Sequence, residues 1–194
     1  PKWSKDGSRI AFSSDRFGND DVFVMPSIGG RPDRLTYHSA PDRVLGFNND
    51  GQVLFNTRRL YAEVEREWEI FGVDQTNAAT EFRYMDALGF DAVVSPDGKK
   101  IAFVRGTCRV AREDYRGPAN RDIWIYHVDT GKYEQLSDFD GNDFMPQWAS
   151  NDELYFISSR AGKYNVFKQK VGSSKAQQVT NESEFGVEHF SIDN

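Results

Sequence analysis

The chain has little of what several functional classes require. Among its 194 residues there is one cysteine, Cys108, and there are three histidines, His38, His127 and His189. A single cysteine cannot form an intrachain disulfide, and the spacing of the histidines suggests neither a shared metal nor a catalytic triad. We therefore expect no metal, no cofactor and no complete catalytic site in this chain.

Excess positive charge and long apolar runs are also lacking. The 24 Lys and Arg residues are outnumbered by 30 Asp and Glu residues, so the net charge is -6. Nucleic acid is therefore not expected as the main partner, because phosphate contacts need a basic surface. No apolar run approaches the roughly 18 residues that suggest a membrane span. The sequence also lacks a Gly-x-Ser-x-Gly nucleophile motif and a phosphate-binding glycine loop.

What the chain does have is aromatic residues placed in an internal repeat. It contains 15 Phe, 8 Tyr and 4 Trp, residue types that suit half-buried strands. Equivalent anchor positions are separated by 44, 47, 54 and 42 residues, and they are occupied by Trp3, Phe47, Val94, Trp148 and Phe190. A period in the forties that is made of short strands is typical of a β-propeller blade.

The turns within the repeat agree with this interpretation. Asp-Gly pairs follow the first strand of three copies, at Asp6 and Gly7, Asp50 and Gly51, and Asp97 and Gly98. Asp-Gly is a strong hairpin signal, because glycine accepts positive φ and aspartate caps its own turn. The fourth copy carries residues 151–153, Asn-Asp-Glu, at this place, so its turn is expected to differ.

We predict an all-β chain that forms one partial β-propeller domain over residues 1–194. Four four-stranded antiparallel blades are placed approximately at 1–37, 38–83, 84–141 and 142–181, and a fifth blade starts within 182–194. The anchors Trp3, Phe47, Val94 and Trp148 are assigned to packing between blades. Four and a half blades do not close a ring of the usual size. We therefore expect the rest of a longer parent chain, or self-association, to cover the open propeller edges.

Two long loops join the second and third strands of adjacent blades, at 58–68 and 105–120. Loops over a rigid scaffold tend to carry function, and arginine can form forked hydrogen bonds to carboxylates. These loops are the candidate peptide-binding or partner-binding face, with Arg58, Arg59, Tyr61, Arg105, Arg109, Arg112, Tyr115 and Arg116. Alternatively, the arginines of the second loop pair with Glu63, Glu65, Glu67 or Glu69 of the first.

The repeat resembles that of TolB-like and tricorn-like proteins. The resemblance rests on the run Trp-Ser-x-Asp-Gly-x-x-Ile-Ala-Phe-x-Ser that starts at Trp3. The longer phrases at 32–43, 120–126 and 136–143 resemble the N-terminal propeller of tricorn-like serine peptidases. This resemblance implies a non-catalytic propeller that guides or filters peptide substrates or supports assembly. It also implies a peptidase parent with a periplasmic or secreted location, a cytoplasmic one being the alternative.

Two other functions are consistent with the same repeat. One is a TolB-like protein–protein interaction module without protease activity. The other is a propeller attached to a prolyl-oligopeptidase-type hydrolase. Propellers host unrelated functions, so the fold by itself does not choose among these.

Overall fold

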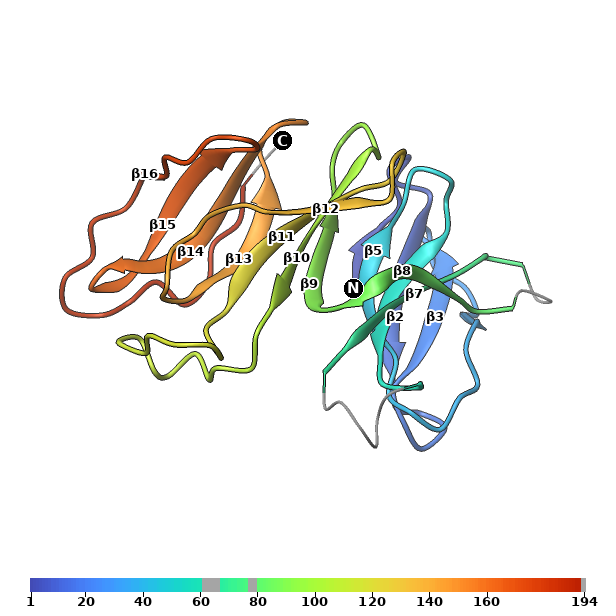
Figure 1. Ribbon diagram of the computed structural model, residues 1–194. Coiled ribbons are helices and arrows are strands. Elements are labelled where there is room, and N and C mark those ends of the chain that lie inside the picture. The colour runs from blue at the N-terminus through green and yellow to red at the C-terminus, as the bar shows by residue number, and fades with distance from the viewer. Residues whose placement is uncertain (61–66, 77–79, 193–194) are drawn as a thin grey trace. The chain divides into compact units, whose positions relative to one another are not determined.

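The structure is a computed structural model that describes residues 1–60, 67–76 and 80–192 (Figure 1). All regular elements in this part of the chain are strands, and they form four antiparallel sheets of four strands each. The predicted all-β fold class is confirmed. The chain divides into two compact units, residues 1–90 and 91–194. No helix that could cross a membrane is found among the described residues.

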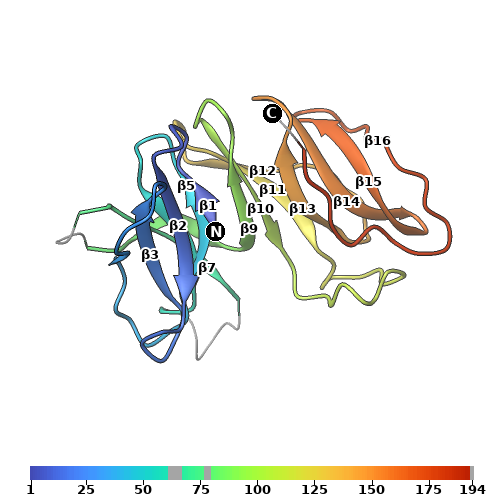
Figure 2. The same ribbon diagram turned by 180° about the vertical axis from the view of Figure 1, so that it is seen from behind.

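The first unit contains two sheets whose strands pair in chain order (Figure 2). The strands of the first sheet are β1 (Lys2–Trp3), β2 (Arg9–Ser14), β3 (Asp21–Pro26) and β4 (Asp33–Arg34). Those of the second sheet are β5 (Arg43–Phe47), β6 (Val53–Thr57), β7 (Glu69–Val73) and β8 (Phe82–Leu88). This simple up-and-down order is the strand order that the repeat predicts for a propeller blade.

The second unit repeats the same plan. Its third sheet comprises β9 (Phe90–Val94), β10 (Lys100–Arg105), β11 (Asp122–His127) and β12 (Lys132–Gln135). Its fourth sheet comprises β13 (Asp143–Trp148), β14 (Glu153–Ala161), β15 (Lys163–Lys170) and β16 (Gln177–Gln178). Residues 182–192, where the start of a fifth blade is predicted, lie along the fourth sheet. There Val187 N–H donates to the Tyr164 carbonyl, and the Gln147 amide donates to the Phe190 carbonyl, both at 2.8 Å.

The Asp-Gly pairs lie in tight turns between the first two strands of three sheets. The N–H groups of Gly7, Gly51 and Gly98 donate to the carbonyl three residues earlier, at 2.9, 3.2 and 2.8 Å. All three glycines have positive φ, between 70° and 79°. The fourth turn keeps the bond from Ala149 N–H to the Glu153 carbonyl, at 2.9 Å, which matches that from Asn48 N–H to the Gln52 carbonyl. It differs at the glycine position, where Asp152 N–H donates to the Ser150 hydroxyl at 3.3 Å.

Side chains between neighbouring sheets form the core. In the first unit one buried cluster joins both sheets, and it contains Ala11, Val22, Val24, Leu35, Val53, Phe55, Phe71 and Val73. The anchor Phe47 packs against this cluster. In the second unit the indole N–H of Trp148 donates to the Val93 carbonyl of the preceding sheet at 2.9 Å. Trp3, on the first strand of the chain, is 62% exposed.

Asparagine side chains hold the connectors between successive sheets. Asn19 donates to the carbonyls of His38 and Ala40, at 2.9 and 3.2 Å. Asn120, 101 residues later, donates to the corresponding carbonyls of Phe139 and Gly141, at 3.4 and 2.9 Å. Because the two connectors are held in the same way, these asparagine hydrogen bonds are a conserved feature of the repeat within this chain.

Candidate functional site: the long loops

Residues 106–121 form the longer of the two candidate loops, between β10 and β11 (Figure 1). Hydrogen bonds fix this loop against the fourth sheet. The Tyr164 hydroxyl donates to the Val110 carbonyl at 2.8 Å, and the Asn142 amide donates to the Arg112 carbonyl at 3.1 Å. Within the loop, Cys108 N–H donates to the Ala119 carbonyl at 2.7 Å. The loop is long, but its backbone is held at several points.

Gly106 begins the loop in a conformation that requires glycine. Its φ is +112°, and a Cβ added there would lie 1.9 Å from the Asn120 carbonyl oxygen. Residues with a Cβ rarely adopt such a φ. The two ends of the loop therefore approach each other closely.

The loop presents its predicted residues in different ways. Arg109 and Arg112 are exposed, and no described carboxylate lies within ion-pair distance of either. The Arg112 guanidinium stacks 4.5 Å from the ring centre of Tyr115. Arg105 is exposed beside Trp124, 5.4 Å from its ring centre. These are cationic groups that a ligand could reach.

Arg116 has a more structural role. It donates to the carbonyls of Glu113 and Tyr115, at 3.2 and 2.9 Å, and lies 3.7 Å from the Asp140 carboxylate. Its guanidinium also stacks on Phe139 at 5.1 Å. These contacts hold Arg116 against its own loop and the following connector.

Two carboxylates at the base of this loop, Asp122 and Asp143, lie where burial disfavours their charged forms. Burial, together with the negative charge of Asp143, raises the pKa of Asp122 to about 6. Burial also raises the pKa of Asp143 above its ordinary value, although Arg160 opposes this shift. Burial also lowers the pKa of the guanidinium of Arg121, the residue before Asp122. Asp122 and Asp143 are thus carboxylates of like charge at the base of the loop, and Arg160 compensates the charge of Asp143.

The arginines of the shorter candidate loop, 58–68, lie against neighbouring side chains. The Arg58 guanidinium stacks on Trp68 at 4.2 Å, and Arg43 lies 5.1 Å from the same ring. Arg59 is only 8% exposed, and its Nη2 lies 2.5 Å from the buried Asp42 carboxylate. Its Nη1 lies 3.3 Å from Glu81. Arg59 is an internal ion-pair partner and does not present a free charge to a ligand.

For the rest of the shorter loop, neither the predicted role of Tyr61 nor the alternative pairing with glutamates is tested. Tyr61 lies outside the described residues, as do Glu63 and Glu65 of the alternative pairing. Glu69 is buried and accepts hydrogen bonds from the N–H groups of Arg59 and Leu60, both at 2.9 Å. The alternative that loop arginines pair with these glutamates stays a prediction.

Sequence reasoning missed a repeated ion pair. Arg160 Nη2 lies 2.6 Å from Asp143, and these two residues follow Arg59 and Asp42 by 101 positions each. Asp143 and Asp42 are both almost fully buried. The signal was present in the sequence as this constant offset, but strand patterns and turn dipeptides do not reveal it.

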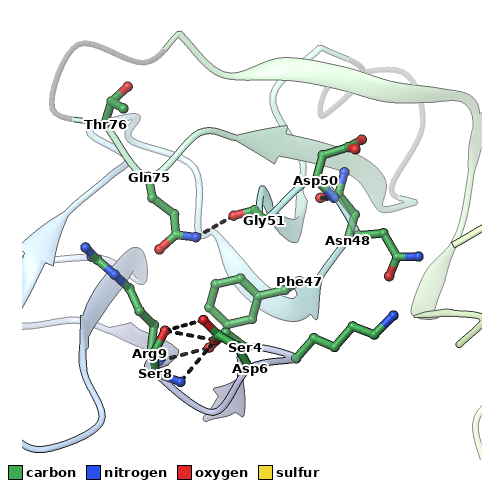
Figure 3. Close-up of a pocket in the computed structure, with 12 residues that line it drawn as sticks. Ser4, Asp6, Ser8, Arg9, Phe47, Asn48, Asp50, Gly51, Gln75 and Thr76 are labelled. Carbon is green, nitrogen blue, oxygen red and sulfur yellow. Dashed lines mark hydrogen bonds between the residues drawn. The ribbon is translucent and has the colours of Figure 1, made fainter. Parts of the chain in front are cut away.

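A cavity of about 690 Å³ lies in the first unit, beside the Asp-Gly turns (Figure 3). On one side, the Asp6 carboxylate accepts hydrogen bonds from the hydroxyls of Ser4 and Ser8 and from Ser8 N–H. These bonds lower the pKa of Asp6 to about 2. On the other side, the Gln75 amide donates to the Gly51 carbonyl at 2.5 Å. Because these polar groups are bonded to one another, they mainly stabilise the turns.

The histidines do not form a site among the described residues. His38 Nδ1 accepts a hydrogen bond from Ala40 N–H at 2.9 Å, and His127 Nε2 lies 3.0 Å from Glu134. No cluster of three or more potential metal-ligating residues occurs in this part of the chain. His38 and His127 thus fill local polar roles.

Comparison with known proteins identifies the scaffold. The family described as "Tricorn protease N-terminal beta propeller domain" matches residues 1–194. Tricorn protease homolog 1 of Streptomyces coelicolor is 29% identical over 195 residues, covering 100% of this chain and 18% of that protein. Dipeptidyl-peptidase 5 of Porphyromonas gingivalis is 26% identical over 130 residues, covering 65% of this chain and 18% of that protein. The chain thus spans less than a fifth of the length of these relatives.

Solved structures give the same fold. A putative TolB from Agrobacterium tumefaciens aligns with a TM-score of 0.69 and 21% identity, over 91% of this chain and 62% of that one. The tricorn protease aligns with a TM-score of 0.69 and 19% identity, over 95% of this chain and 18% of that one. The similarity to these solved structures shows that the four sheets are propeller blades, as the sequence predicted.

Proposed function

The chain belongs to the tricorn protease N-terminal β-propeller family, and from this premise we propose that it is the substrate-handling propeller of a tricorn-like serine peptidase. It performs no bond cleavage itself. It guides or filters peptides that reach a catalytic domain elsewhere in the parent protein. Supporting the assembly of the parent protein is compatible with the same role.

One observation carries the proposal. Arg109 and Arg112 are exposed on a loop whose backbone is held by hydrogen bonds from Asn142 and Tyr164, and neither has a carboxylate partner among the described residues. Guanidinium groups bind carboxylates through two parallel hydrogen bonds. A loop whose backbone is already held in place loses little conformational entropy when a ligand binds. The loop is therefore suited to the C-terminal carboxylate of a peptide.

A binding experiment tests this role. A fluorescein-labelled nonapeptide with a free C-terminal carboxylate and the same peptide as its C-terminal amide are titrated with the protein, and anisotropy is recorded. We expect the free acid to bind at least about tenfold more tightly, because a charge-assisted hydrogen bond is worth about 1.5–3 kcal/mol. The substitutions Arg109→Gln and Arg112→Gln should remove this preference. Arg31→Gln, an exposed arginine of the first unit, is the matched control.

A second function is supported by the similarity of the fold to that of a putative TolB. Under this alternative the chain is a protein–protein interaction module without protease activity, in the periplasm or outside the cell. It predicts equal binding of the free acid and the amide, together with co-purification of a folded protein partner. A parent protein that cleaves no peptide would favour this alternative.

A further inference from the structure

The first and third sheets share the same turn between their first two strands. At an offset of 91 residues, Ser4 corresponds to Ser95, Asp6 to Asp97 and Arg9 to Lys100. The serine hydroxyl donates to the aspartate at 2.7 Å in both turns. It also accepts a hydrogen bond from the backbone N–H of Arg9 or Lys100, at 2.9 or 3.0 Å. Both sheets thus place a cationic side chain at the first residue of the second strand.

In the second unit, the fourth sheet supplies the partner of this cation. Lys100 Nζ lies 2.8 Å from the Asp152 carboxylate and donates to the Asn151 carbonyl at 3.2 Å. Beside it, Asp97 N–H donates to the Asn151 side-chain oxygen at 3.1 Å. Two consecutive residues, an asparagine and an aspartate, therefore connect the two turns of this junction.

In the first unit, the corresponding junction between the first and second sheets has no such partner. The second and fourth sheets correspond at an offset of 101 residues, so Gly51 occupies the position of Asp152. Gly51 has a φ of 79° and no side chain that could reach Arg9. Arg9 is partly buried, and within the described part of the chain no carboxylate lies within ion-pair distance of it.

The cavity of about 690 Å³ lies at this open junction, and Arg9, Phe47 and Gln75 are among the residues that line it (Figure 3). The Gln75 amide nitrogen is fixed by the Gly51 carbonyl, but its oxygen Oε1 is buried and accepts no hydrogen bond from the described residues. The cavity thus offers a cation, an acceptor and an apolar ring. Its volume is in the range of about 300–1,000 Å³ that is usual for ligand sites. Both sheets that flank it belong to the first unit.

We infer that this cavity binds an aspartate residue within a peptide segment. The aspartate carboxylate pairs with the Arg9 guanidinium through charge-assisted hydrogen bonds, as Asp152 pairs with Lys100 in the second unit. A backbone N–H of the peptide donates to Gln75 Oε1, which satisfies a buried acceptor that is costly to leave unpaired. Apolar parts of the neighbouring peptide residues pack on Phe47.

The second unit indicates the class of ligand, because a peptide segment fills the same place there. Asn151 and Asp152 supply a carbonyl, an amide and a carboxylate from two consecutive residues. A bound peptide with the same two residues supplies these groups to the first unit. The cavity recognises an internal acidic side chain, so its binding does not require loop 106–121, which we propose to bind a C-terminal carboxylate.

The test uses the peptide amide Ala-Ala-Asn-Asp-Ala-Ala-NH₂, labelled with fluorescein at its N-terminus, and records anisotropy. This peptide has no free C-terminal carboxylate, and a control peptide replaces its aspartate by asparagine. The protein variants are Arg9→Gln, Arg9→Lys and Gly51→Asp, the last of which installs the residue of the fourth sheet. Arg31→Gln, at an exposed arginine of the first unit, is the matched control for the loss of one positive charge.

We expect the aspartate peptide to bind about fivefold to tenfold more tightly than the asparagine peptide, because hydrogen bonds to charged groups are the stronger ones. Arg9→Gln should remove this preference, and Arg9→Lys should keep it. Gly51→Asp should block binding, because its carboxylate pairs with Arg9 inside the cavity. Arg31→Gln should change nothing.

The double substitution Arg109→Gln and Arg112→Gln should also leave binding of this amide unchanged, so failure of the cavity and failure of the loop are distinguishable. Equal binding of the two peptides, an unaltered preference in Arg9→Gln, or no binding at millimolar concentrations would overturn the inference. A thermal melt of each variant separates loss of binding from loss of folding, above all for Gly51→Asp, where φ is positive.

Discussion

Arg160 and Asp143 form a buried ion pair in the fourth sheet, with Nη2 2.6 Å from Oδ2, and Arg59 forms the same pair with Asp42 101 residues earlier. Each pair joins a residue at or just after the end of the second strand to a residue at or just before the start of the first strand in one blade. Both carboxylates are buried, so each depends on its arginine for charge compensation. Because the same ion pair occurs in two blades, we interpret it as a structural feature of the repeat.

Removing the arginine should therefore be costly. Arg160→Met leaves Asp143 buried and uncompensated, and we expect a loss of about 3–5 kcal/mol in the free energy of unfolding. Urea unfolding measures this change. Lys100→Met is the control, because its partner Asp152 is 71% exposed and such pairs contribute only about 0–1 kcal/mol. Equal effects of the two substitutions would contradict the structural role of the buried pair.

The connector asparagines give a second prediction. Asn120→Ala removes the donor to the carbonyls of Phe139 and Gly141, and we expect a loss of about 1–3 kcal/mol. The connector should also loosen locally, so the Asp143 amide, which donates to the Arg121 carbonyl, should exchange its hydrogen faster. Hydrogen-exchange NMR measures this. The exposed Asn181→Ala serves as the control, and unaltered exchange in Asn120→Ala would argue against the clamp.

Asp122 makes stability depend on pH. Its folded pKa of about 6 lies above the ordinary value of 3.8, so the folded state binds this proton more tightly than the unfolded state. The stabilisation by the protonated form is complete below about pH 4 and is lost as pH rises to about 6. We expect Asp122→Asn to remove this dependence and to be more stable than the parent at pH 7.5, by roughly 1 kcal/mol after allowance for solvent screening.

Unfolding measured at pH 4.5 and pH 7.5 tests this prediction. The difference in stability between Asp122→Asn and the parent should become more favourable to the variant at the higher pH. Asp138→Asn, on the neighbouring connector, is a control for the general effect of removing one charge. A constant difference between the two pH values would contradict the raised pKa.

Tyr164 links the fourth sheet to the candidate loop, and removing its hydroxyl group should affect binding as well as folding. Tyr164→Phe loses the hydrogen bond to Val110 and the contact with the Asn142 amide, each worth about 1 kcal/mol. We expect the free-acid nonapeptide to bind several-fold more weakly, because Arg109 and Arg112 are less well positioned. Tyr155→Phe, on β14, is the matched control. Undiminished binding by Tyr164→Phe would show that loop order is irrelevant to binding.

The sequence predicts the scaffold, and the binding face stays a prediction. The strands and the Asp-Gly turns follow from local patterns, since alternation and turn dipeptides involve neighbouring residues. The repeat predicts a fourth strand in the second blade, but strand β8 carries no Leu-Thr ending like that of the first sheet, so no local pattern marks its position. Anchor spacing nevertheless predicts the correct number of complete blades.

Arg59 illustrates why site prediction was harder. Two adjacent arginines at the start of a long loop suggest an exposed basic patch, but Arg59 turns inward to Asp42, which lies 17 residues earlier. Such a pairing depends on how one blade closes on itself, and local sequence does not encode it visibly. Comparing positions at the offset of 101 residues would have revealed that both members recur.

The most direct measurement of the central claim is peptide hydrolysis by the full-length parent protein, with and without the double substitution Arg109→Gln and Arg112→Gln. Hydrolysis of a nonapeptide with a free C-terminus is compared with that of a short chromogenic substrate that reaches the catalytic domain alone. A substrate-handling propeller predicts that kcat/KM for the nonapeptide falls about tenfold, while the short substrate is unaffected. Unchanged hydrolysis of both substrates, or an equal fall for both, would contradict the account.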